Sequence, residues 1–435
     1  MNPEFRRQLW LGFSPTRLIV LPMLLLACFG AAWLTIAKAT AYARFPSVLY
    51  TTGAVLFAVL VWGMGTFAAG ASVTDEMTDR TWDQQRMSAM RPWAMTWGKL
   101  GGASAFAWYG GALCLLVAVP AAFLDGQGHR VLPVALSVIF FGLSLQALVM
   151  AVNLQSLKSG ETKARRGIAA ILAVLFFSGL TPLFAPFRES TVTWWGQPFN
   201  NLNFVLASVA LLATCALVSA WRSMAEVLAV RQMPWGWAAL ALIITVYLTG
   251  FAPKLVMETF SFLGMAVCSG LTFFALLTEP QPRPLWQRVV TRLSAGQWRA
   301  ALLQLPRWPT TLLLAVPFAL LTWASLNQSN VQPWLSAEQI QLNPIAFLLL
   351  MVRDCALLLY FAFAINNRRV VASFLLLMVV LYGLLPWLVG AFNSPILLGL
   401  VQPLLAKSSL AVAAAAVHAA LALALLRWRW RATAP

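Results

Sequence analysis

Charged residues are scarce in this sequence. Of its 435 residues only 10% are Asp, Glu, Lys or Arg, whereas 60% are hydrophobic. Soluble domains carry about a quarter of their residues as charged side chains, so a soluble fold with this composition could not cover its own surface. The sequence therefore predicts an all-α polytopic membrane protein that lies in a lipid bilayer.

Acidic residues are scarcer still, with 13 Asp and Glu against 30 Lys and Arg, which gives a formal net charge of +17. In a soluble protein this excess would suggest binding to nucleic acid. In a membrane protein, Lys and Arg instead accumulate in cytoplasmic loops. We therefore predict no nucleic-acid partner.

Metal-binding and catalytic patterns are also missing. The two histidines, His129 and His418, have no partner nearby in the sequence, and Gly98–Lys99 lacks the other residues of a phosphate-binding loop. All the cysteines lie in apolar runs without a CxxC pair, so they read as small core residues: Cys28, Cys114, Cys215, Cys268 and Cys355. We predict that the chain is not an enzyme and holds no metal or cofactor.

Long apolar runs fill the rest of the chain. A membrane helix needs about 20 mostly apolar residues. By this measure we predict twelve spans, and we interpret the first as a membrane helix rather than a cleaved signal: 18–37, 48–70, 101–123, 131–152, 167–184, 203–221, 237–253, 258–278, 309–325, 343–365, 370–390 and 409–426. With the N-terminus inside, 23 of the 30 Lys and Arg residues fall on the cytoplasmic side. Both termini are therefore expected in the cytoplasm.

The two halves of the chain resemble each other in the order and length of their loops. A long cytoplasmic connector follows the second span, at 71–100, and another follows the eighth, at 279–308. We therefore predict two related six-helix units, 1–222 and 223–435, that arose by duplication.

The first connector, "VTDEMTDRTWDQQRMSAMRPWAMTWGKL" from Val73 to Leu100, concentrates negative charge. It holds four of the thirteen acidic residues: Asp75, Glu76, Asp79 and Asp83. Since no Gly or Pro occurs before Pro92, the pattern predicts a short amphipathic helix over 73–90, with favourable pairs between Glu76 and Arg80 and between Asp83 and Arg86. A solvated connector without a partner is the alternative.

The order of residues in this connector resembles the signature of type-2 ABC exporter permeases. In that family an acidic residue and a Thr follow the second helix, and a Pro and a "GK" pair precede the third; here these are Glu76, Thr81, Pro92 and Gly98–Lys99. The resemblance is best over about 70–200. Arg80 stands where the family usually has Gly, and the second connector lacks the signature and is basic.

The resemblance implies that the connector is a coupling helix that docks into a separate cytoplasmic ATPase. Its contact residues would include Asp79 and Trp82 beside the signature residues. The chain would then be a permease subunit in a bacterial inner membrane. Two ATPase copies would bind and hydrolyse ATP, and a substrate would cross by alternating access.

A major-facilitator-like secondary transporter, coupled to protons or ions, is the alternative function. It too has twelve helices in two halves, but its signature loop has a Gly and an Arg pair that do not follow Asp79–Arg80 here. Carriers of this class often place carboxylates inside their helices. The pair Arg353–Asp354, in the middle of the tenth span, is a candidate for such a polar transport path, or for a structural helix-packing pair.

Overall fold

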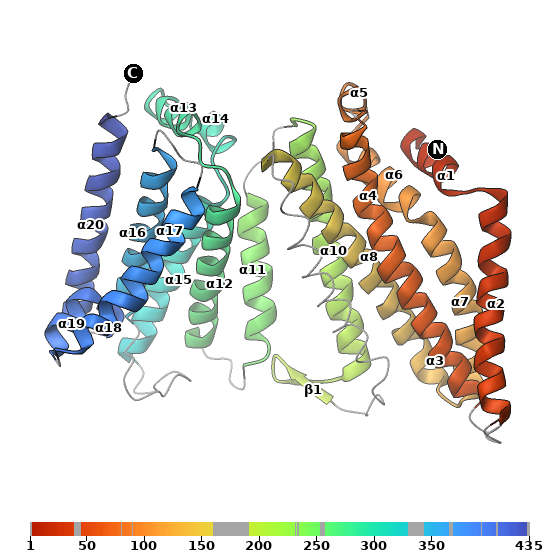
Figure 1. Ribbon diagram of the computed structural model, residues 1–435. Coiled ribbons are helices and arrows are strands. Elements are labelled where there is room, and N and C mark those ends of the chain that lie inside the picture. Colours follow the sequence, from red (N-terminus) through yellow and green to blue (C-terminus); the bar gives the residue numbers. More distant parts are fainter. Residues whose placement is uncertain are drawn as a thin grey trace. The chain divides into compact units, whose positions relative to one another are not determined.

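The computed structural model describes residues 2–38, 45–79, 81–88, 90–159, 191–230, 232, 235–252, 257–328, 343–364, 369–392, 394–405 and 408–432. It is 85% helical with almost no sheet, which makes the protein an all-α polytopic membrane protein. Its contacts divide the chain into two compact units (Figure 1). Unit 1 comprises Met1–Val192 and Pro198–Gln232, and unit 2 comprises Thr193–Gln197 and Met233–Pro435.

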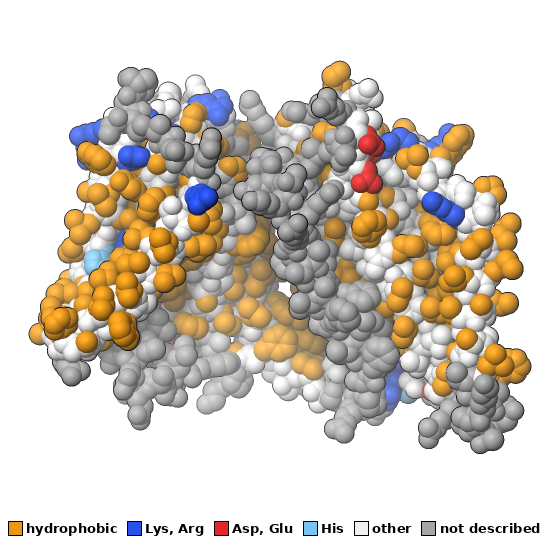
Figure 2. Space-filling model, viewed as in Figure 1, with side chains coloured by type: hydrophobic (Ala, Val, Ile, Leu, Met, Phe, Trp, Pro, Cys, Tyr) orange, Lys and Arg blue, Asp and Glu red, His pale blue; other side chains and the backbone are white. Residues whose placement is uncertain are grey.

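Within the described residues, ten helices are long and apolar enough to cross a membrane. Each coincides with a predicted span: Pro15–Leu34, Phe45–Glu76, Ala105–Leu124, Gly128–Gln155, Asn201–Val227, Met257–Thr278, Trp308–Ser325, Pro344–Ala362, Val370–Gly390 and Leu410–Arg431. Hydrophobic side chains cover the middle of both units, and Lys and Arg side chains gather toward the ends (Figure 2). This distribution is expected where lipid tails surround the middle of a protein.

Two of the twelve predicted spans are not among these ten helices. The fifth, 167–184, lies outside the described residues. In place of the seventh the structure has α11, Trp235–Thr249, whose 15 residues are fewer than a span requires. The count of twelve and the cytoplasmic position of both termini therefore stay predictions, as does the duplication.

Unit 1 begins with a helix that the hydropathy pattern does not reveal. This helix, α1, precedes the first span, and a five-residue helix, α5, lies between the second and third spans. The helices of unit 1 are α1 (Pro3–Gly12), α2 (Pro15–Lys38), α3 (Phe45–Phe57), the π-helix η2 (Ala58–Met64), α4 (Gly65–Thr78), α5 (Trp82–Arg86), α6 (Pro92–Ala103), α7 (Ala105–Leu124), α8 (Gly128–Ser159) and α10 (Asn201–Val227).

Close packing around the π-helix η2 holds the second, third and fourth spans of unit 1 together. A Cβ on Gly111 would approach Val61 to 2.5 Å, and one on Gly142 would approach it to 2.8 Å, so both neighbouring helices need glycine there. A π-helix disturbs the regular backbone hydrogen bonding of a helix. Buried Gln146 donates to the Val61 carbonyl at 3.0 Å and accepts from Trp108 at 3.1 Å, which satisfies both sides of its amide.

Unit 2 packs its helices around α16, the most buried of its spans. Its helices are α11, α12 (Met257–Thr278), α13 (Arg283–Ser294), α14 (Trp298–Leu302), α15 (Trp308–Gln328), α16 (Pro344–Ala362), α17 (Val370–Val379), the π-helix η3 (Val380–Leu384), α18 (Leu385–Gly390), α19 (Pro395–Val401), the 3₁₀ helix η4 (Pro403–Leu405) and α20 (Ser408–Ala432). Cores of small and aromatic side chains lie between α12 and α15 and between α16 and α20.

A two-stranded hairpin, β1 (Thr191–Trp194) and β2 (Gln197–Asn200), is the sheet in the described residues. Its turn residues Trp195 and Gly196 have φ of 53° and 72°. Positive φ at both central residues matches the right-handed twist of a hairpin and favours Gly. The Trp195 amide donates to the Gly250 carbonyl at 2.7 Å, and the Trp194 indole donates to the Tyr247 carbonyl at 3.1 Å, so the hairpin caps the end of α11.

Candidate functional site at the first connector

The first connector is not one helix. The predicted helix over 73–90 is wrong, because α4 continues the second span only to Thr78 and α5 forms separately at Trp82–Arg86. The chain turns between them, where the Thr81 amide and hydroxyl both donate to the Glu76 carbonyl, at 2.9 and 3.2 Å. A side-chain hydroxyl that competes for a backbone carbonyl favours such a helix end.

The other features of the predicted connector have mixed outcomes. Pro92 lies in the first turn of α6, where a missing amide hydrogen costs nothing, so it begins a helix and does not end the predicted one. Arg80 and the side chains of Asp83 and Arg86 lie outside the described residues, and the ion pairs predicted for them stay predictions.

Glu76 lies inside the protein and not on the connector surface. It is 7% exposed, and Lys99 of α6, the helix that precedes the third span, is fully buried beside it. The Lys99 ammonium pairs with the Glu76 carboxylate, so the acidic residue and the "GK" lysine join the two helices that flank the connector, α4 and α6. The expectation that Glu76 offers an exposed charge for docking is therefore wrong.

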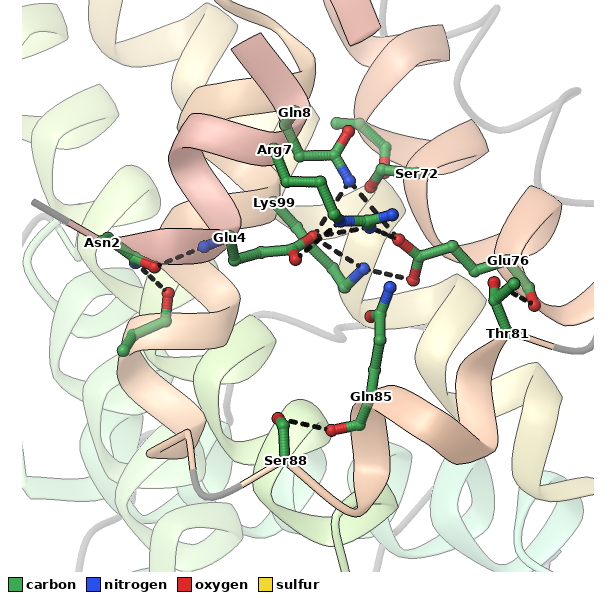
Figure 3. A network of polar contacts seen from close by, with 12 residues as sticks. Asn2, Glu4, Arg7, Gln8, Ser72, Glu76, Thr81, Gln85, Ser88 and Lys99 are labelled. Carbon is green, nitrogen blue, oxygen red and sulfur yellow. Dashed lines mark hydrogen bonds and ion pairs between the residues drawn. The ribbon is translucent and has the colours of Figure 1, made fainter. Parts of the chain in front are cut away.

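Helix α1 completes this buried site. Its Glu4 is 3% exposed and accepts from Lys99 at 3.1 Å, from Arg7 at 2.9 Å and from Gln8 at 3.0 Å. Arg7 also pairs with Glu76, and the Gln8 amide reaches the same Glu76 oxygen at 3.4 Å. Figure 3 shows the two carboxylates facing each other with the cations between them. We call these five residues the connector ion cluster.

The connector ion cluster is balanced in charge, with two carboxylates and two cations. Burial raises the pKa of Glu4, but the hydrogen bond from Arg7, the charge of Lys99 and the hydrogen bond from Gln8 outweigh it and hold this pKa at about 2. The hydrogen bond to Glu4 in turn raises the pKa of Arg7. Because the pKa of Glu4 is lowered on folding, its stabilising effect is complete above about 4.5 and is lost as pH falls toward about 2.

Helix α1 reaches the cluster because α6 presents glycines to it. A Cβ on Gly98 would lie 2.8 Å from the Cβ of Glu4, and a Cβ on Gly102 would lie 2.6 Å from the Cβ of Gln8. The Asn2 side chain caps the start of α1 at the Glu4 amide and also donates to the Ala94 carbonyl of α6. Gly98 of the predicted signature therefore serves close helix packing.

The glycine contact makes a testable prediction. Gly102→Ala should push α1 away from α6, since its new methyl group would meet Gln8 and also the Phe5 carbonyl at 3.2 Å. Overpacking of this kind costs about 1–3 kcal/mol. We expect a lower thermal unfolding midpoint in detergent and faster proteolysis before the first span. Gly270→Ala in α12, with nothing within 4 Å of its Cβ, is the control and should match the wild type.

Trp82 anchors α5 to unit 1. Its ring is 7% exposed, packs in the core with Val73, Met95 and Met150, and lies 5.6 Å from the Lys99 ammonium. A cation over an indole face adds to the stability of both groups. Trp82 is thus an internal contact residue and not the exposed contact residue that was expected.

The exposed part of the connector is smaller than the sequence suggested. Asp75 and Asp79 lie on its surface together with Gln84, Met87 and Ser88, and Met87 is 84% exposed. Of the residues predicted to contact a partner, Asp79 is accessible, whereas Glu76, Trp82 and Lys99 are buried. Pro92 is half-buried at the start of α6, and Gly98 lies under α1.

A second polar group lies within the spans of unit 2. Arg353 and Asp354 of α16 are 5% and 2% exposed, and they pair with each other at 2.8 Å. The Asp354 carboxylate accepts from the Tyr382 hydroxyl of η3 at 2.7 Å, and Arg353 lies 3.3 Å from the His418 ring of α20. The Arg353–Asp354 pair of α16 therefore contacts η3 and α20, so this polar group links three spans.

The roles of Glu4, Arg7 and Gln8 could not be predicted from the sequence. Asn2–Pro3 is a helix-start pattern, and Glu4, Arg7 and Gln8 have the spacing of one helix face. These signals could have revealed α1 but not its partner.

Comparisons of the chain with protein family models, with curated proteins and with solved structures give no significant match.

Proposed function

We propose that this protein is a transport protein, the permease subunit of an ABC exporter, in a bacterial inner membrane with both termini in the cytoplasm. Two copies of a separate ATPase would dock on its cytoplasmic face and supply the energy for alternating access. The chain itself would bind no cofactor, because ATP would bind to the partner.

The observation that carries this proposal is the arrangement of the first connector. Its exposed residues, Asp75, Asp79 and Met87, belong to a segment that is anchored by Trp82 and by the Glu76–Lys99 pair. A partner that moved this segment would move α4, which ends the second span, and α6, which leads into the third, because the ion pair joins these two helices. A short, anchored connector with an acidic surface suits a docking site that transmits motion to membrane helices.

Charge reversal on the connector surface tests this proposal. Asp75→Lys/Asp79→Lys changes exposed charges, so the fold should stay intact. Reversed charge at an interface is unfavourable by several kcal/mol, and we expect ATPase association to fall at least about tenfold. The measurement is the amount of ATPase that co-purifies from native membranes and the ATP hydrolysis of the assembled complex.

Asp125→Lys is the matched control, because Asp125 lies in the turn between α7 and α8, at the predicted external end. It should leave the ATPase bound. If no ATPase co-purifies with the wild-type chain, or if the Asp75/Asp79 variant keeps its full complement, the ABC proposal fails.

An ion-coupled secondary transporter remains the second candidate, supported by the group at Arg353, Asp354, Tyr382 and His418. Ionisable residues inside spans frequently mark ion pathways. Transport in vesicles distinguishes the two candidates. Transport that stops with a protonophore and needs no ATP would support the carrier, whereas transport that needs ATP and the partner ATPase would support the exporter.

A further inference from the structure

The connector between α12 and α15 of unit 2 forms a helical hairpin of a different kind from the first connector. Helix α13 and the short helix α14 are joined by a turn at Gly296, whose φ is +71°. Arg292 of α13 donates to the Ala300 carbonyl of α14 at 3.1 Å, which holds the two helices together. In Figure 1 this hairpin lies across one end of the spans of unit 2.

One face of the hairpin packs onto unit 2. Val289 is 2% exposed, and the Trp286 ring lies against the Trp308 ring at 5.6 Å. Both indoles donate to the Gln281 side chain at 3.3 Å. The hairpin therefore has a fixed orientation and presents its opposite face outward.

The exposed side chains of the hairpin include both arginines and apolar residues. Val290, Leu293 and Trp298 are 51%, 53% and 58% exposed. Arg288 and Arg299 are exposed as well, and the sequence has no acidic residue from 280 to 308. An amphipathic helix with basic residues and exposed aliphatic and Trp side chains is typical of a helix that lies in the membrane interface.

A shallow hollow on α13 adds a place for an anion. It is lined by Pro284, Gln287, Arg288, Thr291 and Arg292. Guanidinium groups bind phosphate oxygens with strong, charge-assisted hydrogen bonds, and amide and hydroxyl groups can add neutral ones. The lining thus has the donors that a phosphate group requires.

The hairpin is tied close to the membrane at both ends. Only residues 279–282 separate the end of α12 from α13, and only 303–307 separate α14 from α15. Five extended residues span at most about 18 Å. Glu279 and Arg307 pair at 3.2 Å across the base of the hairpin and hold these two linkers together. The outward face therefore stays within reach of lipid headgroups.

We propose that the α13–α14 hairpin is a binding surface for anionic phospholipids of the surrounding membrane. The arginines would contact the headgroup phosphates, and Val290, Leu293 and Trp298 would enter the boundary between headgroups and acyl chains. An acidic protein partner would use the charge, but exposed aliphatic and Trp side chains beside basic residues, held at headgroup depth, favour lipid. The inference is independent of the proposed transport function.

A nitroxide spin label at position 290 tests the proposal in the full-length chain. We would introduce Val290→Cys into a chain whose five native cysteines are replaced by alanine, and reconstitute it in nanodiscs of phosphatidylcholine with increasing phosphatidylglycerol. Collisions of the label with a water-soluble nickel chelate should fall as phosphatidylglycerol rises. Each arginine near an anionic surface contributes about fivefold in affinity. Arg288→Gln/Arg299→Gln should therefore lower the apparent affinity for phosphatidylglycerol, read from the fall in collisions, roughly thirtyfold.

The matched control is Arg288→Lys/Arg299→Lys, which keeps both charges and should retain most of the response. A label that is equally accessible in both lipids would overturn the proposal. A second measurement avoids the cysteine replacements: a photo-crosslinking amino acid at position 290 of the otherwise native chain, in cells. Crosslinks to phospholipid support the proposal, whereas a crosslink to a protein in place of lipid overturns it.

Discussion

Lys99→Met should strongly destabilise unit 1. The substitution keeps the length of the side chain but removes the cation that lies between the Glu4 and Glu76 carboxylates. The two buried acids would then share Arg7 alone, which is partly exposed. Removing one partner from a buried ion pair costs about 3–5 kcal/mol, because an unpaired charge stays in a medium of low dielectric constant. We expect a large fall in the thermal unfolding midpoint in detergent and in the yield of folded protein.

The double variant Glu76→Gln/Lys99→Met controls for this explanation. It removes one charge of each sign and should recover part of the lost stability, since the remaining pair of Glu4 and Arg7 is balanced. If Lys99→Met alone melts at the wild-type temperature, the connector ion cluster does not stabilise the fold. Lys99→Arg tests geometry: it keeps the charge but must fit a planar guanidinium into a fully buried position.

Asp354→Asn should have a comparably large effect on unit 2. An asparagine keeps the size of the side chain and can still accept from Tyr382, but it leaves the buried Arg353 without a counter-charge. An unpaired charge within a span costs at least about 2.5–3.5 kcal/mol. We expect a lower unfolding midpoint and lower membrane expression, measured with a fluorescent fusion at the C-terminus.

The apolar double replacement Arg353→Met/Asp354→Leu distinguishes structure from function at this site. Replacing a buried ion pair by apolar side chains of similar volume is often neutral or stabilising. If this variant is stable and transports normally, the pair only packs helices together. If it is stable but transports nothing, Arg353 and Asp354 belong to the transport path. A stable Asp354→Asn variant would instead show that Arg353 finds another partner.

The membrane spans could be predicted from the sequence because each one is a local property. A run of about 20 apolar residues has to cross the membrane or be buried inside the protein, whatever structure the rest of the chain forms. This is why ten predicted spans coincide with helices. The seventh span, 237–253, stays a prediction, because its apolar run contains Gly250 and Pro253 and α11 ends at Thr249.

The connector was harder to predict because its chemistry depends on distant residues. Glu76 looked like a surface charge among other acids, and nothing near it in sequence reveals a buried partner. Its partners Arg7 and Lys99 lie 69 and 23 positions away. Likewise, no Gly or Pro marks the end of α4; a hydrogen bond from Thr81 to the Glu76 carbonyl ends it instead. The pairing of Arg353 with Asp354 also depends on Tyr382 and His418, from two other helices.

The short helix α11 has a consequence for the lipid around it. Fifteen residues at 1.5 Å each give a rod of about 23 Å, whereas the hydrocarbon layer is about 30 Å thick. Trp194 and Trp195 of the hairpin bond to carbonyls at the end of this rod, and indole side chains prefer headgroup depth. If α11 crosses the membrane and the bilayer adapts by thinning, it would thin by about 7 Å beside this helix. A polar headgroup that moved across the membrane along α11 would then travel a shorter path through hydrocarbon than a headgroup that crossed beside a span of full length.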